Sequence, residues 1–340
     1  MGDPTTPQGK QQLERQSPLN SAARIRTPLL IVQGANDPRV NKRESDQIVL
    51  ALRDRKFAVQ YLVAPDEGHG FARPVNTMAL FTAAEKFLAE HLGARFQEGG
   101  TPEVLARLKE ITVDPETVVL PPKVNPAAGA PQVAASLQAG VYKYKATLKT
   151  GGASLDMNLV TVIQEAEGAW MVTDTISLPT GEASDTTTLD KKSLTLATRS
   201  IKQGAVTVEY AFKENKVQGK MTANGRETPI DVAVGGPLFA DGAGSSSAIG
   251  ALPLVEGYSV TIRNFDIQTQ KAKLMQVKVT GVEKVDVPAG SFSCYRVEVT
   301  SAEGGPESST VWIAMDSRKP VKTSSALPQL AGARMVVELQ

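Results

Sequence analysis

The sequence predicts a chain of two unlike parts, an α/β part followed by an all-β part. Residues 1–93 hold both histidines and alternate strand-like with helix-like segments, whereas residues 140–340 alternate apolar and polar side chains with a period of two. Between them, residues 114–138 are rich in proline and alanine, which is typical of an extended linker because proline fixes φ and lacks an amide donor. We therefore place a first domain at 1–95, a short helix and linker at 96–138, and a second domain at 139–340.

Length and composition agree with this division and exclude several classes of protein. A chain of 340 residues is long enough for about two domains. Its 37 Lys and Arg residues nearly balance its 36 Asp and Glu residues, so the formal charge of +1 argues against a nucleic-acid binder. One cysteine excludes an internal disulfide and a cysteine-based zinc cluster, and two histidines exclude most histidine-rich metal sites. We expect no metal, no cofactor and, without a long apolar window or an apolar core near Met1, no membrane span or signal peptide.

The first part is expected to fold as strand, helix, strand and helix, in that order. Residues 28–32 form a continuous apolar run that is typical of a buried strand, and residues 58–63 form a second one. Asn41 precedes the first helix as an N-cap, and Gly93 is a natural end for the second. The apolar positions of these helices are Ile48, Val49 and Leu52 in the first, and Met78, Phe81, Ala84, Leu88 and Leu92 in the second. This order predicts a right-handed βαβ unit with a C-terminal helix.

A short amphipathic helix is expected to precede the linker. Thr101, Pro102 and Glu103 suit its N-cap, N1 and N2 positions. Its apolar side is formed by Val104, Leu105, Leu108 and Ile111.

Two polar residues follow the two predicted strands at their carboxyl ends, where open α/β sheets place their chemistry. Asp37 lies in the first loop and His69 in the second. An acid followed by a histidine matches the last two members of the α/β-hydrolase triad, whose chain order is Ser, acid, His. Asp37 would hold the imidazole in one tautomer, and its other nitrogen would take a proton from a serine hydroxyl. Gly68 and Gly70 would let the loop bend so that the ring points to the site.

Residues 17–93 closely resemble the C-terminal end of the catalytic domain of prolyl oligopeptidase family serine peptidases. The resemblance is carried by residues 27–31, 33–40, 66–71 and 87–93. It implies a partial α/β-hydrolase, in which Asp37 and His69 match the acid and base of the family, and a peptide or ester as substrate.

The serine nucleophile of that family is not found in this sequence. Its Gly-x-Ser-x-Gly elbow should precede the acid, and the pattern does not occur; residues 244–247 come nearest but lie downstream. Ser17 and Ser21 precede Asp37 without an elbow. We therefore expect a truncated or split family member that is inactive alone. The open apolar edge of its first strand invites docking by another chain, such as an upstream hydrolase segment that bears the serine.

Other reactive side chains of the chain have simpler interpretations. His91 fits the last turn of a helix, where a cation is favoured, or plain solvent exposure. Asp66 and Glu67 beside one imidazole make a poor metal site. Arg39 could bind a substrate carboxylate, but we favour an ion pair with Asp37 or Glu67.

The second part contains many predicted strands. They include residues 141–148, 206–212, 230–234, 258–262, 274–279, 292–299, 311–315 and 334–339. Asn224 and Gly225 predict a two-residue type I′ hairpin, and the Gly/Ser/Ala-rich residues 242–250 predict a flexible loop. This pattern indicates one large antiparallel curved sheet or half-open β-barrel. Within it, Cys294 is expected to be a small structural residue, and Trp170 and Trp312 are expected to pack on the sheet.

Residues 140–340 resemble a bacterial envelope domain family of unknown function with a lipoprotein-carrier-like β architecture. The resemblance is carried by residues 252–257, 285–292, 297–299 and 311–316, with 320–322. This resemblance implies no catalytic residues for the second part. Three functions stay open: a serine hydrolase fragment, a β-rich binding module for an apolar ligand, and a domain that docks the peptidase to a surface. The resemblances place the parent protein outside the cytoplasm, in the periplasm or cell envelope, while the compartment of this chain stays unassigned.

Overall fold

The computed structural model describes residues 2–3, 6–37, 39–120, 129–150, 153–179, 181–330 and 333–340, leaving aside the Gln329 side chain. The chain divides into two compact units. Unit 1 comprises Met1–Pro122, Gly304–Pro306 and Pro328–Gly332, and unit 2 comprises the rest. Part of the predicted linker, with Pro121, Pro122 and Pro126, lies outside the described residues.

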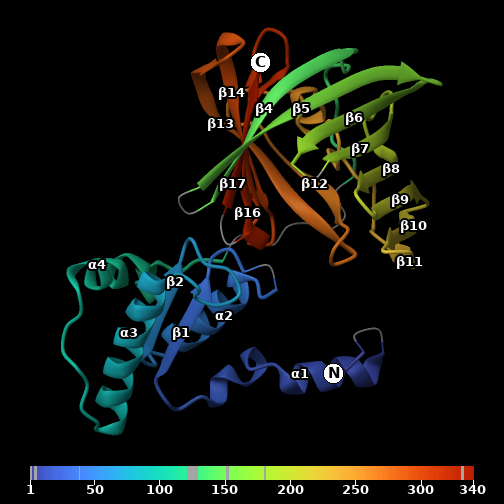
Figure 1. The fold of residues 1–340 in the computed structure, drawn as a ribbon. Helices are drawn as coiled ribbons and strands as arrows, with labels where there is room; N and C mark the ends of the chain where they lie inside the picture. Colours follow the sequence, from blue (N-terminus) through green and yellow to red (C-terminus); the bar gives the residue numbers. More distant parts are fainter. Residues whose placement is uncertain are drawn as a thin grey trace. The chain divides into compact units, whose positions relative to one another are not determined.

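Unit 1 contains the predicted βαβ arrangement (Figure 1). Strands β1 (Leu29–Gly34) and β2 (Val59–Ala64) are parallel and in register from Leu29↔Val59 to Gly34↔Ala64. Between them runs α2 (Lys42–Arg53), and after β2 come α3 (Pro74–Leu92) and α4 (Pro102–Ile111). The sequence did not predict α1 (Pro7–Gln16) or β3 (Thr112–Val113), which is antiparallel to β2. Short 3-10 turns are η1 (Leu19–Arg24), η2 (Pro115–Thr117) and η3 (Pro328–Leu330).

The predicted helix ends of unit 1 are confirmed by their hydrogen bonds. The Asn41 side chain accepts from the amide of Arg43 at 2.9 Å, and Thr101 accepts from Val104 at 3.3 Å. Gly93 ends α3 in the left-handed region, with φ of 71°.

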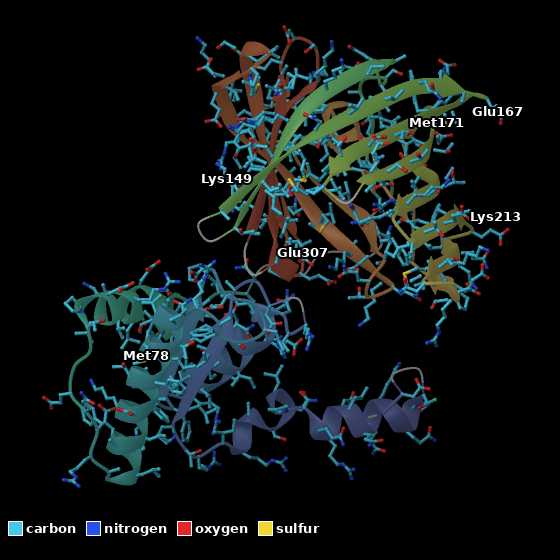
Figure 2. The ribbon with its side chains drawn as sticks, in the orientation of Figure 1. Met78, Lys149, Glu167, Met171, Lys213 and Glu307 are labelled. Atoms are coloured by element: carbon cyan, nitrogen blue, oxygen red, sulfur yellow. The ribbon has the colours of Figure 1, made fainter. Side chains whose placement is uncertain are left out.

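The orientation of α3 differs from what its apolar positions suggest. Its apolar residues Met78, Phe81, Leu88 and Leu92 are 53%, 57%, 51% and 76% exposed. The residues that it buries are small or polar, namely Asn76, Ala79, Ala83 and Ala89. Small side chains on the buried face let the helix approach its neighbours closely. The four larger residues lie on the exposed side of the helix (Met78 is labelled in Figure 2).

Unit 2 is built on one curved antiparallel sheet of fourteen strands (Figure 1). Its spatial order is β11-β10-β9-β8-β7-β6-β5-β4-β17-β16-β15-β14-β13-β12, so the first and last strands of the unit pair with each other. The strands that precede residue 234 are β4 (Gly140–Thr150), β5 (Ala153–Ala166), β6 (Ala169–Leu178), β7 (Gly181–Asp190), β8 (Leu196–Gln203), β9 (Val206–Lys213), β10 (Lys216–Ala223) and β11 (Arg226–Ala233). The strands that follow residue 254 are β12 (Ser259–Asp266), β13 (Lys271–Val287), β14 (Gly290–Ser301), β15 (Ser308–Ala314), β16 (Pro320–Leu327) and β17 (Ala333–Leu339).

The predicted hairpin between β10 and β11 is confirmed. Asn224 and Gly225 have φ of 51° and 77°, the two positive values that a type I′ turn requires. Glu214 and Asn215 turn in the same way between β9 and β10, with φ of 53° and 62°. No glycine marks that second turn, so the sequence does not predict it.

The curved sheet of unit 2 packs around a segment of its own chain, residues 234–254. This segment buries Leu238, Phe239, Ile249, Leu252 and Leu254 against side chains from the earlier strands β5–β11 and the later strands β12–β15. The prediction of a flexible loop over 242–250 is therefore wrong, because residues 245–250 form the short helix α5 (Ser245–Gly250) within this core. Glycine is needed at its start, since a Cβ on Gly244 would lie 2.6 Å from the Val172 side chain.

Candidate functional site

The parallel strands β1 and β2 bring the two predicted site residues together in unit 1. Asp37 follows β1 and His69 follows β2, and both strands end at the same edge of the sheet. The Nδ1 atom of His69 lies 2.8 Å from Oδ2 of Asp37. The two side chains therefore form one hydrogen-bonded acid–imidazole pair.

Asp37 is held as the anionic member of this pair. Its side chain is 7% exposed, and its Oδ1 accepts from the amides of Arg39 at 2.8 Å and Val40 at 3.0 Å. Burial raises the pKa of the Asp37 carboxyl, but the hydrogen bonds from Val40, His69 and Arg39 outweigh it and lower that pKa below its ordinary value. A carboxylate at this position accepts a hydrogen bond from Nδ1–H and so fixes the tautomer of the ring.

The second ring nitrogen of His69, Nε2, is not engaged by the protein residues that the structure describes. Its side chain is 48% exposed, and Nε2 makes no hydrogen bond to any residue that the structure describes. With the proton on Nδ1, Nε2 is a free acceptor. The pair can therefore take a proton from a hydroxyl placed within hydrogen-bond reach of Nε2.

The loops that carry Asp37 and His69 are held together through their backbones. Asn36 donates its amide to the Glu67 carbonyl at 2.9 Å and its Nδ2 to the Pro65 carbonyl at 2.6 Å. Gly34 permits this approach, since a Cβ there would lie 2.0 Å from the Gly68 carbonyl oxygen. Gly70, with φ of 113°, turns the chain directly after His69.

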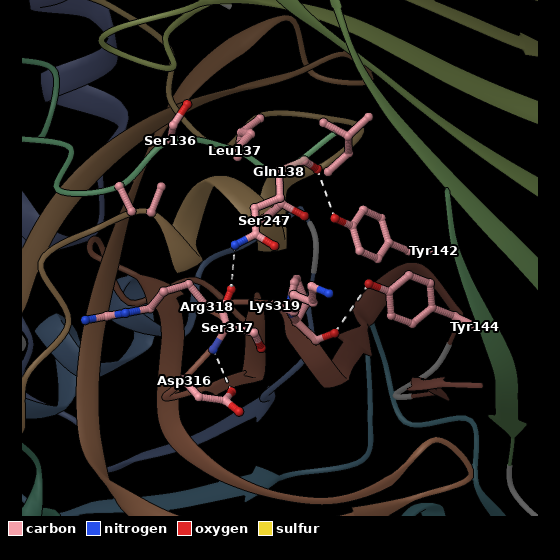
Figure 3. A pocket seen from close by; sticks show the side chains of 14 residues that line it. Ser136, Leu137, Gln138, Tyr142, Tyr144, Ser247, Asp316, Ser317, Arg318 and Lys319 are labelled. Atoms are coloured by element: carbon pink, nitrogen blue, oxygen red, sulfur yellow. Dashed lines mark hydrogen bonds between the residues drawn. The ribbon is translucent and has the colours of Figure 1, made fainter. Parts of the chain in front are cut away.

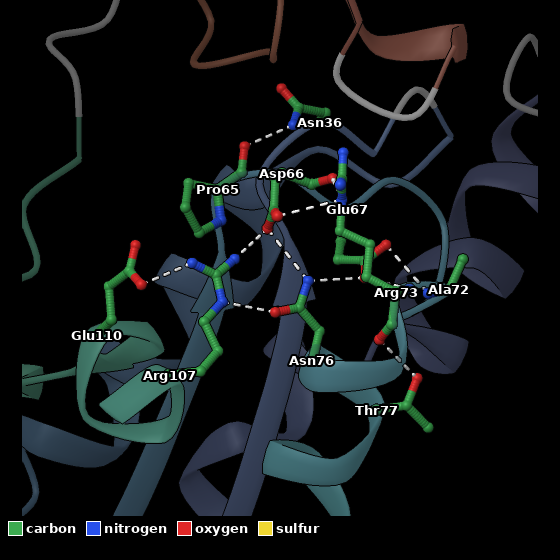
Figure 4. A network of polar contacts seen from close by, with 10 residues as sticks. All are labelled: Asn36, Pro65, Asp66, Glu67, Ala72, Arg73, Asn76, Thr77, Arg107 and Glu110. Carbon is green, nitrogen blue, oxygen red and sulfur yellow. Dashed lines mark hydrogen bonds and ion pairs between the residues drawn. The ribbon is translucent and has the colours of Figure 1, made fainter. Parts of the chain in front are cut away.

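A network of polar contacts joins the residues on either side of His69 to α3 and α4 (Figure 4). The Glu67 carboxylate accepts from the amides of Ala72 at 3.0 Å and Arg73 at 2.8 Å, and from Nδ2 of Asn76 at 2.8 Å. Arg107 of α4 donates to Oδ1 of Asn76 at 2.6 Å and also pairs with Asp66. Sequence reasoning did not find Asn76 or Arg107, because their partners lie on other elements. The network fixes both ends of the loop that holds His69.

The remaining reactive residues of unit 1 serve structural contacts. The expected ion pair of Arg39 with Asp37 or Glu67 is not formed; Arg39 is exposed and contacts Asp37 only through its backbone amide. Asp66 and Glu67 are engaged in the network, and the described residues hold no cluster of His, Cys, Asp and Glu suited to a metal. His91 lies exposed in the last turn of α3, with its ring 4.6 Å from that of Phe87.

The serines that sequence reasoning considered lie in ordinary structural positions. Ser17 is the C-cap of α1, and Ser21, in η1, accepts a hydrogen bond from Arg24. Residues 244–247 begin the short helix α5 of unit 2.

Unit 2 contains one buried thiol and a small cavity whose tyrosines bond to backbone carbonyls. Cys294 is fully buried in β14, and burial raises the pKa of its thiol to about 11, so it stays a neutral packing residue. A small cavity of about 90 Å³ lies beside α5 (Figure 3), where Tyr142 donates to the Gln138 carbonyl at 2.9 Å and Tyr144 donates to the Pro320 carbonyl at 3.3 Å.

Among the described helices of the chain, none combines the length and apolar character that a bilayer crossing requires.

Two family models match separate parts of the chain. The family model described as the prolyl oligopeptidase family matches residues 1–95, and the model of a protein of unknown function, DUF3108, matches residues 140–335. Both resemblances expected from the sequence are thereby confirmed.

Two curated relatives are similar to less than a third of this chain. Dipeptidyl aminopeptidase BIII of Pseudoxanthomonas mexicana is 54% identical over 100 residues, which cover 29% of this chain and 14% of that protein. Dipeptidyl peptidase family member 6 of Caenorhabditis elegans is 48% identical over 90 residues, covering 26% of this chain and 12% of that protein. The chain thus spans 14% and 12% of the lengths of these two relatives.

Solved structures are similar over the larger part of the chain. A β-barrel-like protein of DUF1849 from Brucella abortus covers 61% of this chain and 98% of its own, with 11% identity and a TM-score of 0.42. The hypothetical lipoprotein YmcC from Escherichia coli covers 58% and 83%, with 12% identity and a TM-score of 0.26.

Proposed function

Since the chain belongs through residues 140–335 to DUF3108, a family of proteins of unknown function, and since residues 1–95 are a prolyl oligopeptidase family segment, we propose that unit 1 supplies the acid and base of a serine-type peptidase site. The observation that carries the proposal is the 2.8 Å contact between Asp37 and His69, with Nε2 of His69 open. The substrate class is a peptide or an ester.

In this site His69 acts as the general base and Asp37 as its positioning partner. Nε2 takes the proton of a serine hydroxyl as the oxygen attacks the carbonyl carbon, and the Asp37 carboxylate stabilises the imidazolium that forms. His69 then returns the proton to the leaving amine or alcohol.

No Gly-x-Ser-x-Gly elbow occurs in the 340 residues. The serine hydroxyl is therefore supplied by a segment that is not among these residues. We propose that this segment pairs along the free edge of β1. Among the described strands β1 pairs with β2 alone, and its apolar residues 29–32 are only half-buried. An added strand would pair with the open backbone groups and shield one flank of these side chains. Without it, the chain is inactive.

A split-enzyme experiment tests this proposal. The Pseudoxanthomonas relative, shortened by the 100 residues that align with this chain, is co-expressed with the full 340-residue chain. We expect a fluorophosphonate probe to label neither protein alone and to label the relative's serine in the pair. His69→Ala should abolish hydrolysis by the pair, whereas His91→Ala, at the other histidine of the chain, should leave it unchanged. Labelling of this chain alone, or complementation that survives His69→Ala, would refute the proposal.

The alternative function, a binding module for an apolar ligand in unit 2, is not favoured by any described apolar cavity. The interior of the curved sheet is occupied by Phe239, Ile249, Leu252 and other residues of the segment 234–254. A core filled by its own chain requires no ligand.

A further inference from the structure

A second cleft in unit 2 differs from this filled core because its lining is mixed. It has a volume of about 320 Å³ and lies between α5 and the inner face of β12–β16. That volume is at the lower end of what small-molecule sites occupy. The cleft is independent of the site proposed in unit 1.

One side of the cleft is apolar. Ile262, Met275, Val299 and Val311 line it from four neighbouring strands, and Ile249 lines it from α5. These side chains can cover a short alkyl chain, which would release water from their surface.

The charged end of the cleft carries an excess of carboxylates. Asp241, Asp266 and Glu307 line it together with a single cation, Lys273. Lys273 pairs with both Asp266 and Glu307 at 2.5 Å. Arg199, which does not line the cleft, pairs with Asp241 at 3.0 Å and also with Asp185 at 2.8 Å. Two cations are thus shared among four carboxylates, which favours a positive ligand.

One carboxylate oxygen in this group is left without a partner. Both oxygens of Asp241 are used, by Arg199 and by the Phe265 amide at 2.9 Å. Those of Asp266 accept from Lys273 and from the amides of Gln268 and Thr269. In Glu307 (labelled in Figure 2), Oε1 faces Lys273, whereas Oε2 accepts no hydrogen bond from any described residue. A donor on a ligand can therefore bind Oε2 of Glu307 without displacing Lys273.

We propose that this cleft binds a small amphipathic organic cation, with its alkyl part on Met275, Val299 and Val311 and its ammonium group on Glu307. Ser309 and Ser325, which are hydrogen-bonded to each other at 2.8 Å, line the path between the two ends. The charge of the head group selects the ligand, and the apolar side limits the length of its chain.

Calorimetric titration of the full chain with octylammonium, octanol and octanoate tests the proposal, since these probes differ in head group only. We expect octylammonium to bind about tenfold or more tightly than octanol, octanoate to bind least, and the preference to shrink at high salt. Equal affinity for octylammonium and octanol, tighter binding of octanoate, or no binding of octylammonium would each overturn it.

Variants locate the binding site. Glu307→Gln should weaken octylammonium about tenfold and leave octanol unchanged. Glu227→Gln is the matched control, because Glu227 forms an exposed ion pair with Lys220 on the β10–β11 hairpin, outside the cleft. Ser325→Leu should fill the cleft and abolish binding of both probes, while circular dichroism reports whether each variant folds. Unchanged octylammonium affinity in folded Glu307→Gln or Ser325→Leu would refute the assignment.

Discussion

The two units of this protein place their apolar side chains in opposite ways. In unit 2 the chain returns through residues 234–254 to fill the inside of its own sheet, with Phe239 and Leu254 almost fully buried. In unit 1 the apolar strand β1 is only half-buried, and Met78 and Phe81 of α3 lie more than half exposed. The acid–imidazole pair lies in the unit whose apolar surfaces are less covered. An acid–imidazole pair can therefore be formed on a unit that leaves apolar surface available for a further chain.

The largest effect is expected from a cavity in the filled unit. Phe239→Ala removes a fully buried ring and should destabilise unit 2 by about 3–5 kcal/mol. Phe81→Ala, the matched change on the exposed face of α3, should alter the stability of unit 1 by less than about 0.5 kcal/mol. Tryptophan fluorescence in urea reports unit 2 because both tryptophans lie there, and hydrogen exchange of the β2 amides reports unit 1. Similar losses in both variants would show that the two units do not differ in how they bury these rings.

A smaller loss is expected from the contact between the loops of the pair. Gly34→Ala places a methyl group 2.0 Å from the Gly68 carbonyl oxygen, so the loops should separate at a cost of about 1–3 kcal/mol. Gly68→Ala is the control, since a Cβ there would lie 3.8 Å from the Asn36 carbonyl oxygen. Faster exchange of the Asn36 amide in Gly34→Ala, but not in Gly68→Ala, checks the prediction. Equal exchange in both would show that the close approach does not hold the loops.

A pH effect of one carboxyl group should follow from Asp37. Its pKa is lower in the folded protein, so its contribution to stability is present above its ordinary value of 3.8 and is lost as the pH falls through the folded value. The stability difference between the wild type and Asp37→Asn should therefore shrink on acidification. Urea unfolding of unit 1, followed by hydrogen exchange between neutral and acidic pH, measures it. A difference that stays constant or grows at low pH would contradict the assigned direction.

The smallest effect on stability is expected at the exposed stripe of α3. Phe81→Ser should leave the unfolding free energy of unit 1 within about 0.5 kcal/mol while reducing self-association of the chain. Analytical ultracentrifugation compares it with Val141→Ser, which changes a single exposed apolar residue on β4 of unit 2. If both variants associate like the wild type, the stripe does not drive contacts between copies.

Features that depend on neighbours in the sequence could be predicted directly. Asn41 and Thr101 cap their helices because a side-chain oxygen reaches an amide two or three residues ahead. Asn224 and Gly225 specify their turn because they tolerate positive φ. Asp37 and His69 meet because each directly follows a strand, and parallel strands end at one edge.

Other features depend on residues far apart in the sequence. Arg107 reaches Asn76 across 31 positions, and no local pattern marks either residue as part of the support for His69. The Gly/Ser/Ala-rich composition of residues 242–250 resembles that of a flexible loop, but the curved sheet offers an apolar interior that this segment fills.

The sequence alone was enough to predict the βαβ order of unit 1, the caps at Asn41 and Thr101, the Asn224–Gly225 turn and the acid–histidine pair at the strand ends, because hydrogen bonds and backbone torsions of nearby residues govern these features. Three-dimensional packing sets which face of α3 is buried, which segment fills unit 2, and which oxygen of Glu307 has no hydrogen-bond partner among the described residues. Burial and pairing are set by whichever surfaces the fold brings together, and that outcome is not a property of any single segment.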